Sequence, residues 1–148
     1  MSGGSGHNFS EIYLHINWHC RNDEPMIRPE IRGQLYEIIE EYCCKVKGIH
    51  FEKLAGTQNH VHAVFQMEPF VLLSDFIGKV KGASAHEVNK QFGPETIRWQ
   101  RGYGVVSFSK KHLPAVLSYV ESQEKHHEAG TTNKVMETHW VQRRQGQD

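Results

Sequence analysis

Two histidines that flank one apolar residue, His60 and His62, are the residues of this sequence best suited to binding a metal ion. They lie in the largely apolar run formed by residues 59–65. If this run is a β-strand, both imidazoles point to the same face, because side chains alternate along a strand with period 2. The sequence has 11 histidines, so the pair is a weak signal until a third ligand and a nucleophile accompany it.

Tyr119 and Gln123 are the candidates for those two roles. They are four residues apart in a segment with apolar residues at helical spacing, so they fall one turn apart on one face, and His126 continues that face. If this helix packs beside the strand, Gln123 could give a carbonyl oxygen to a metal held by His60 and His62, leaving open positions for a substrate oxygen. Tyr119 would then be a nucleophile, activated by the metal's field or a nearby base.

Each of these residues also has a purely structural interpretation. A tyrosine beside an apolar helical stripe can be a packing residue whose hydroxyl faces water. An exposed helical glutamine can simply be solvated. A pair of strand histidines can be hydrogen-bonded to neighbours instead of a metal, because buried polar groups need partners.

The hydrophobic periodicity predicts the element order β-α-β-β-α-β-α. Pro29 is placed to begin the first helix, and Gly48 to end it. This order is the ferredoxin-like split βαβ pattern of an α+β fold, an antiparallel sheet with helices on one face plus a C-terminal helix carrying Tyr119. The predicted strands cover residues 12–19, a strand starting at Ile49, 60–67 and 105–108, and the predicted helices follow Pro29, Leu73 and Leu113.

The length of 148 residues predicts a single domain. We expect a flexible leader or expression remnant over residues 1–8, the functional domain over 9–128, and a loosely attached or partner-dependent polar tail over 129–148, with Trp140 its only large apolar anchor. The three cysteines suit neither a disulfide framework nor a Cys-x-x-Cys zinc site, which favours the cytoplasm. No apolar run approaches the roughly 18 to 20 residues of a membrane span, so no membrane association is expected.

Charge is balanced overall but uneven along the chain. The formal net charge is zero, which argues against a protein that coats nucleic acid non-specifically. Residues 79–111 nevertheless include seven basic and two acidic side chains. This window is either a phosphate-facing surface or a set of solvated helix and loop positions.

Three segments together resemble a known family. They are the His60-Val61-His62 triplet, the Tyr119–Gln123 segment followed by His126 and His127, and the Trp-Gln-Arg-Gly-Tyr-Gly stretch at residues 99–104. The chain is similar in these segments to the single-tyrosine transposases of the HUH endonuclease superfamily. These include small insertion-sequence transposases and the relatives associated with repetitive extragenic palindromes.

The resemblance implies a metal-dependent single-stranded DNA endonuclease and strand transferase. By this analogy His60, His62 and Gln123 hold Mg²⁺ or Mn²⁺, and Tyr119 attacks the scissile phosphate to give a 5′-phosphotyrosine link and a free 3′-hydroxyl. Two imidazoles and an amide suit Zn²⁺ or Mn²⁺ better than Mg²⁺, so the ion stays open.

The resemblance also implies a homodimer that recognises a DNA hairpin. The basic window is then the place for hairpin and single-strand contacts, and Trp99 or Tyr103 is either a base-stacking platform or a core residue. The DNA-binding residues predicted in this way are Lys79, Lys81, Arg98, Arg101, Lys110 and Lys111.

Two other functions remain open at this point. One is a domesticated, regulatory DNA-hairpin-binding protein that has no transposition activity. The other is a metal-dependent hydrolase of small phosphoesters on the same kind of sheet, because a fold does not fix a function. Four intact site residues favour the transposase, since a binding module does not need a tyrosine one helical turn from a metal ligand.

Overall fold

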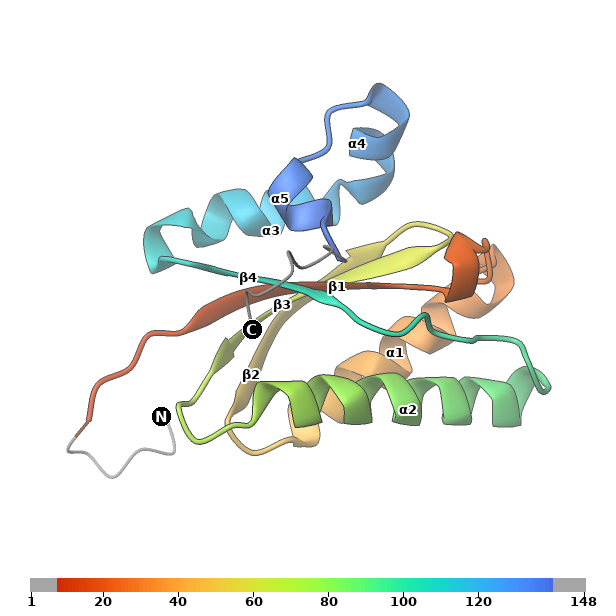
Figure 1. Ribbon diagram of the computed structural model, residues 1–148, viewed down its shortest axis with the longest axis horizontal. Helices are drawn as coiled ribbons and strands as arrows, with labels where there is room; N and C mark the ends of the chain where they lie inside the picture. Colours follow the sequence, from red (N-terminus) through yellow and green to blue (C-terminus); the bar gives the residue numbers. More distant parts are fainter. Residues whose placement is uncertain (1–7, 140–148) are drawn as a thin grey trace, which may run out of the picture.

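A computed structural model describes residues 8–139 of the chain. Its centre is a four-stranded antiparallel sheet in the order β2-β3-β1-β4 (Figure 1). The predicted α+β class with an antiparallel sheet is therefore confirmed. The strands are β1 (Tyr13–His19), β2 (Ile49–Gly56), β3 (His60–Met67) and β4 (Gly104–Phe108).

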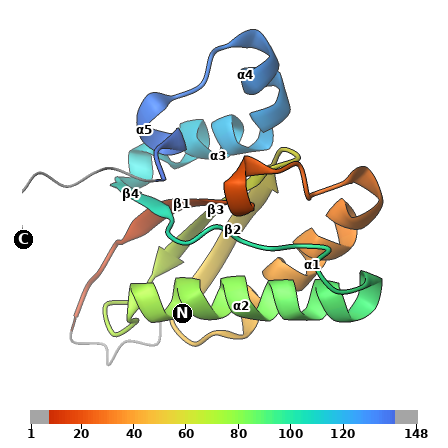
Figure 2. The same ribbon diagram turned by 45° about the vertical axis from the view of Figure 1, so that its right-hand side comes forward.

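Two long helices cover one face of the sheet, and Figures 1 and 2 show both on the same side. They are α1 (Pro29–Lys45), with Pro29 at its first turn, and α2 (Leu73–Phe92), which ends at Gly93. Their apolar stripes bury Leu35 and Ile77 against alternate residues of the two central strands. None of the helices within residues 8–139 has the length and apolar character that crossing a membrane requires.

The other face of the sheet is covered by the C-terminal third of the chain (Figure 2). Here lie α3 (Leu113–Glu121), α4 (Gln123–Ala129) and the short α5 (Lys134–Glu137). The expected single helix is thus two helices separated at Ser122, whose ψ of 29° interrupts the regular turn. Where the sequence predicted a loosely attached tail, residues 133–138 pack against β1 and β4; Trp140 lies outside the described residues.

Strand β1 is buried on both faces, although polar and apolar residues alternate along it, a pattern typical of a strand with one buried face. Its apolar residues Ile16 and Trp18 enter the main core, and its polar residues His15 and Asn17 are each 1% exposed. The polar residues are covered because α3 and α5 lie over that face. Buried polar side chains need partners, so this face of the sheet is where a functional site is expected.

The cysteines give a direct test of this packing. Cys20 and Cys43 are buried and Cys44 is exposed, and burial raises the pKa of Cys20 to about 11 and that of Cys43 to about 12. We expect one thiol to react rapidly with a chromogenic disulfide reagent at pH 8, and the other two only after unfolding in guanidinium. Cys44→Ser should remove the rapid phase, and rapid reaction of a second thiol would contradict the packing.

Candidate active site

His60 and His62 project from β3 toward the face that α3 and α5 cover. The register pairs His60 with His19 and His62 with Asn17 on β1. Val64, the next residue with this orientation, packs against α3, while Val61 and Phe65 enter the core on the opposite side. The strand period therefore places both imidazoles on one face, as the sequence predicted. Both side chains are almost completely buried, at 2% and 0% exposed.

Neighbouring side chains fix the orientation of the His60 ring. Its Nδ1 lies 2.7 Å from Asn59 Oδ1 and 3.0 Å from Thr57 Oγ1. An amide oxygen only accepts hydrogen bonds, so His60 Nδ1–H donates to Asn59, and in the neutral ring Nε2 keeps its lone pair. Such a partner on the far nitrogen is typical of a metal-binding histidine.

His62 is held in a similar way by a histidine of β1. His62 Nδ1 lies 2.6 Å from His15 Nε2. Burial lowers the pKa of His62, and it lowers the pKa of His15 to about 3 with a further contribution from His62. Both rings are therefore neutral at pH 7, and a neutral imidazole is the form that binds a metal.

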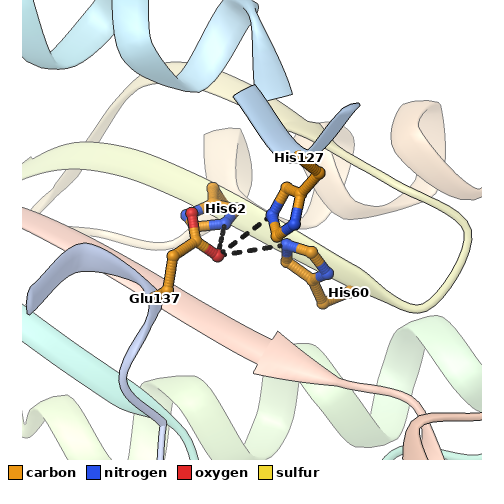
Figure 3. A group of neighbouring side chains, drawn as sticks. All are labelled: His60, His62, His127 and Glu137. Atoms are coloured by element: carbon orange, nitrogen blue, oxygen red, sulfur yellow. Dashed lines mark hydrogen bonds and ion pairs between the residues drawn. The ribbon is translucent and has the colours of Figure 1, made fainter. Parts of the chain in front are cut away.

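A carboxylate from the C-terminal segment lies between the histidines, as Figure 3 shows. Oε1 of Glu137 is 3.4 Å from His60 Nε2, 3.2 Å from His62 Nε2 and 3.3 Å from His127 Nε2. The ordinary pKa of a glutamic acid is about 4.3, and Oε2 of Glu137 accepts the hydroxyl hydrogen of Tyr119, so this carboxyl is ionised at neutral pH.

Tyr119 lies next to this cluster on α3. Its hydroxyl donates to Glu137 Oε2 and accepts the Asn133 backbone N–H at 2.8 Å. Its ring stacks on His126, with centroids 4.6 Å apart, so His126 supports the tyrosine ring while His127 faces the carboxylate. Burial and the bond to Glu137 raise the pKa of Tyr119 to about 12, so the phenol is protonated at neutral pH.

Gln123 begins α4 and is 1% exposed. Its Nε2 donates to the Tyr119 backbone oxygen at 3.5 Å, and its Oε1 lies 3.3 Å from His60 Nε2. The structure thus brings together all four residues that the sequence singled out, in spite of the helix break at Ser122.

The donor atoms fit a metal ion. Gln123 Oε1 and Glu137 Oε1 lie 3.3 and 3.4 Å from His60 Nε2, and in their ordinary neutral or ionised states none of these atoms carries a hydrogen for the others. Acceptor atoms packed together in a buried place require a cation or an added proton between them. His62 and His127 complete a group of nitrogen and oxygen donors.

The six predicted DNA-binding residues are not gathered in one place. Lys79 and Lys81 lie on α2, across the sheet from Tyr119. Lys79 pairs with Asp75, and Lys81 Nζ donates to the carbonyls of Gln100 and Gly102, both at 2.8 Å.

The other four predicted residues lie at exposed positions. Arg98 pairs with Glu95, whereas Arg101, Lys110 and Lys111 form no ion pair within residues 8–139. Trp99, a possible base-stacking residue, packs edge-on against Trp18 in the main core and donates to Ser84.

The sequence reasoning missed Glu137, the role of His127 and the polar residues of β1. Glu137 lies in a segment whose composition predicted a tail, and no periodic pattern leads to it. The alternation of His15, Asn17 and His19 along β1 was a signal, because three polar residues on one strand face can line a site as well as face water.

Comparisons with known proteins agree on one family. The family described as "Transposase IS200 like" matches residues 8–123. The ISDra2 transposase TnpA of Deinococcus radiodurans is 22% identical over 131 residues, which cover 83% of this chain and 91% of that protein.

Two solved structures share the fold. A crystal structure of a protein assigned as a transposase from Deinococcus radiodurans R1 has a TM-score of 0.65 at 22% identity, covering 83% of this chain and 98% of that one. A REP-associated tyrosine transposase bound to a REP hairpin has a TM-score of 0.61 at 13% identity, covering 89% of this chain and 76% of that one.

Proposed function

Because the chain belongs to the IS200-like transposase family, we propose that it is a metal-dependent single-stranded DNA endonuclease and strand transferase acting at DNA hairpins. Tyr119 is the proposed nucleophile, and His60, His62 and Gln123 are the proposed metal ligands. The observation that supports this most strongly is the convergence of the Tyr119 hydroxyl and both histidine Nε2 atoms on one carboxylate, Glu137. A phenol this close to a cluster of metal donors is arranged for attack on a phosphate bound there.

The proposed reaction has two transesterification steps. Tyr119 Oη forms a bond to phosphorus and loses its proton, while the bond from phosphorus to the 3′ oxygen breaks and that oxygen takes up a proton. The products are a 5′-phosphotyrosine link and a free 3′-hydroxyl. A 3′-hydroxyl of another DNA end then loses its proton as it bonds to the same phosphorus, while the bond from phosphorus to Tyr119 Oη breaks and Oη takes up a proton, so strands are rejoined without ATP. A divalent ion such as Mg²⁺ or Mn²⁺ would polarise the phosphate and stabilise its developing charge.

The chain's own residues define the surroundings of this chemistry. His60 and His62 are buried, and their far nitrogens are oriented by Asn59 and His15. His126 holds the ring of Tyr119 by stacking. These contacts keep the nucleophile and the metal donors in a fixed relation, which is the requirement for rapid transfer.

The defining experiment uses pools of 5′- and 3′-labelled single-stranded hairpin DNA with Mn²⁺ or Mg²⁺, followed by denaturing gels that retain protein. We expect a protein-linked 5′-phosphate product that disappears with EDTA. Hairpin retention without covalent product across a broad sequence pool would indicate the domesticated regulatory protein instead. Hydrolysis of small phosphoesters without any DNA product would instead indicate a metal-dependent phosphoester hydrolase.

Of the six predicted DNA-binding residues, we retain three as proposed DNA contacts, namely Arg101, Lys110 and Lys111. Lys110 and Lys111 precede α3, in the same layer as Tyr119, and make no ion pair within the described residues. Replacing both with alanine should weaken hairpin binding and lower the slope of log affinity against log salt by about 1.4 to 1.8, because two phosphate contacts are lost. Lys79→Ala, on the far face of the sheet, is the control. Equal losses in both variants would remove this assignment.

We also propose a homodimer located in the cytoplasm. The dimer follows from the family resemblance, and the location is supported by three unpaired cysteines. Light scattering coupled to size-exclusion chromatography measures the mass directly. A monomer at micromolar concentration, with and without hairpin DNA, would contradict the dimer.

A further inference from the structure

Glu137 contacts both the histidine cluster and the Tyr119 hydroxyl. It is not among the predicted metal ligands, which are His60, His62 and Gln123. We propose that Glu137 is itself a ligand of the divalent ion through Oε1 and positions the Tyr119 hydroxyl through Oε2. This inference rests on the proposed function, because it concerns the same metal and the same nucleophile. It assigns the C-terminal segment, residues 133–138, to the catalytic site.

The distances around Oε1 support the ligand role. Two donors bound at about 2.1 Å to one ion lie about 3.0 to 3.4 Å apart at angles between a right angle and the tetrahedral angle. Glu137 Oε1 lies 3.2 to 3.4 Å from the Nε2 atoms of His60, His62 and His127. These are the separations of atoms that share an ion, and they are longer than an ordinary hydrogen bond between such groups.

The number of donors also fits a catalytic ion. With Gln123 Oε1, the site offers five protein atoms. These five donors exceed the four of a closed tetrahedral site, so they would suit an ion that accepts more than four ligands and that could also take a phosphate oxygen. The mixed imidazole, amide and carboxylate set then favours Mn²⁺, which accepts both nitrogen and oxygen ligands.

The second oxygen of the same carboxylate fixes the nucleophile. Tyr119 donates its hydroxyl hydrogen to Glu137 Oε2 and accepts the Asn133 N–H, so both polar contacts of the hydroxyl come from one segment. With donor and acceptor directions both defined, the hydroxyl has a single orientation. A change in Glu137 therefore alters the metal site and the nucleophile together.

Hydrogen bonds anchor the segment that carries Glu137. Asn133 Oδ1 accepts the N–H groups of Val135 and Met136 and caps α5. Asn17 Nδ2 donates to the Met136 and Thr138 carbonyls at 2.9 and 3.1 Å.

One anchor depends on a glycine. A Cβ at Gly104 would lie 1.9 Å from Thr138 O, so only glycine permits this approach of the segment to β4. Gly104→Ala should therefore displace the segment without altering any donor atom. Gly78 on α2 has open space around a Cβ, which makes Gly78→Ala the matched control.

The test measures Mn²⁺ affinity of the full chain by isothermal titration calorimetry, without DNA. We expect Glu137→Ala to weaken Mn²⁺ binding at least about 100-fold, at or above the loss that follows removal of an outer partner of a ligand, and Glu137→Gln, which keeps a carbonyl oxygen, to weaken it less. Gly104→Ala should weaken binding in the same direction, and the double variant Gly104→Ala/Glu137→Ala should lose little more than Glu137→Ala alone. Glu128→Gln, an exposed charge change on α4, and Gly78→Ala should leave the affinity unchanged.

The covalent assay at saturating Mn²⁺ reports the second role. We expect Glu137→Ala to form phosphotyrosine product at least about 10-fold more slowly than the wild type even when the ion is bound, because the hydroxyl is no longer oriented. Unchanged Mn²⁺ affinity in Glu137→Ala, or faster product formation, would overturn the proposal and make Glu137 a cap over the site. Loss of affinity in His62→Ala but not in Glu137→Ala would overturn this inference alone, whereas absence of Mn²⁺ binding in the wild type would overturn the metal site of the proposed function as well.

Discussion

Replacing Tyr119 with phenylalanine is expected to abolish the covalent protein–DNA product, a loss of at least about 1,000-fold, because phenylalanine has no side-chain oxygen that could bond to phosphorus. Hairpin affinity should change less than about 2-fold, since the ring and its stacking on His126 are kept. The measurement is the amount of labelled DNA retained with protein on a denaturing gel, alongside a native binding titration.

The matched control for this substitution is Tyr36→Phe. Tyr36 lies on α1, and its hydroxyl is buried without a hydrogen-bond partner within the described residues. Its removal should leave the covalent product unchanged. Loss of product in both variants would indicate a general effect of losing a hydroxyl, and retained product in Tyr119→Phe would remove the nucleophile assignment.

Replacing His62 with alanine should remove both metal binding and cleavage. His62 is 0% exposed and contributes Nε2 to the cluster, while His15 orients it from the other side. Loss of a direct ligand is expected to cost at least about 100-fold in Mn²⁺ affinity, which is at or above the loss seen when an outer partner of a ligand is removed. Calorimetry gives the affinity, and the labelled-DNA assay with and without EDTA gives the activity.

His86→Ala is the control for His62→Ala. His86 is exposed on α2, across the sheet from the cluster, so its removal should change neither the Mn²⁺ affinity nor the DNA cleavage activity. Thermal unfolding of both variants separates loss of the site from loss of the fold, because a cavity at a buried histidine also costs stability. A folded His62→Ala protein that binds Mn²⁺ like the wild type would exclude His62 as a ligand.

Local patterns in the sequence were enough to predict the strands, the long helices and four residues of the candidate site. Side chains on a strand alternate whatever surrounds them, so His60 and His62 had to share a face once residues 60–67 were taken as a strand. Helical spacing placed Tyr119 and Gln123 one turn apart in the same way. These relations depend only on neighbouring backbone geometry, and the break at Ser122 left the two side chains close together.

The rest of the site depends on contacts between residues far apart in the chain. Glu137 reaches His62 across 75 positions because Asn17 and Gly104 hold the segment that carries it, and neither contact leaves a periodic trace in the sequence. Likewise, the polar face of β1 is buried only because α3 and α5 fold over it. The sequence by itself therefore determined which residues share a face, through bond geometry that repeats every few residues. Only the tertiary structure decided which faces meet, because that depends on the packing of distant segments.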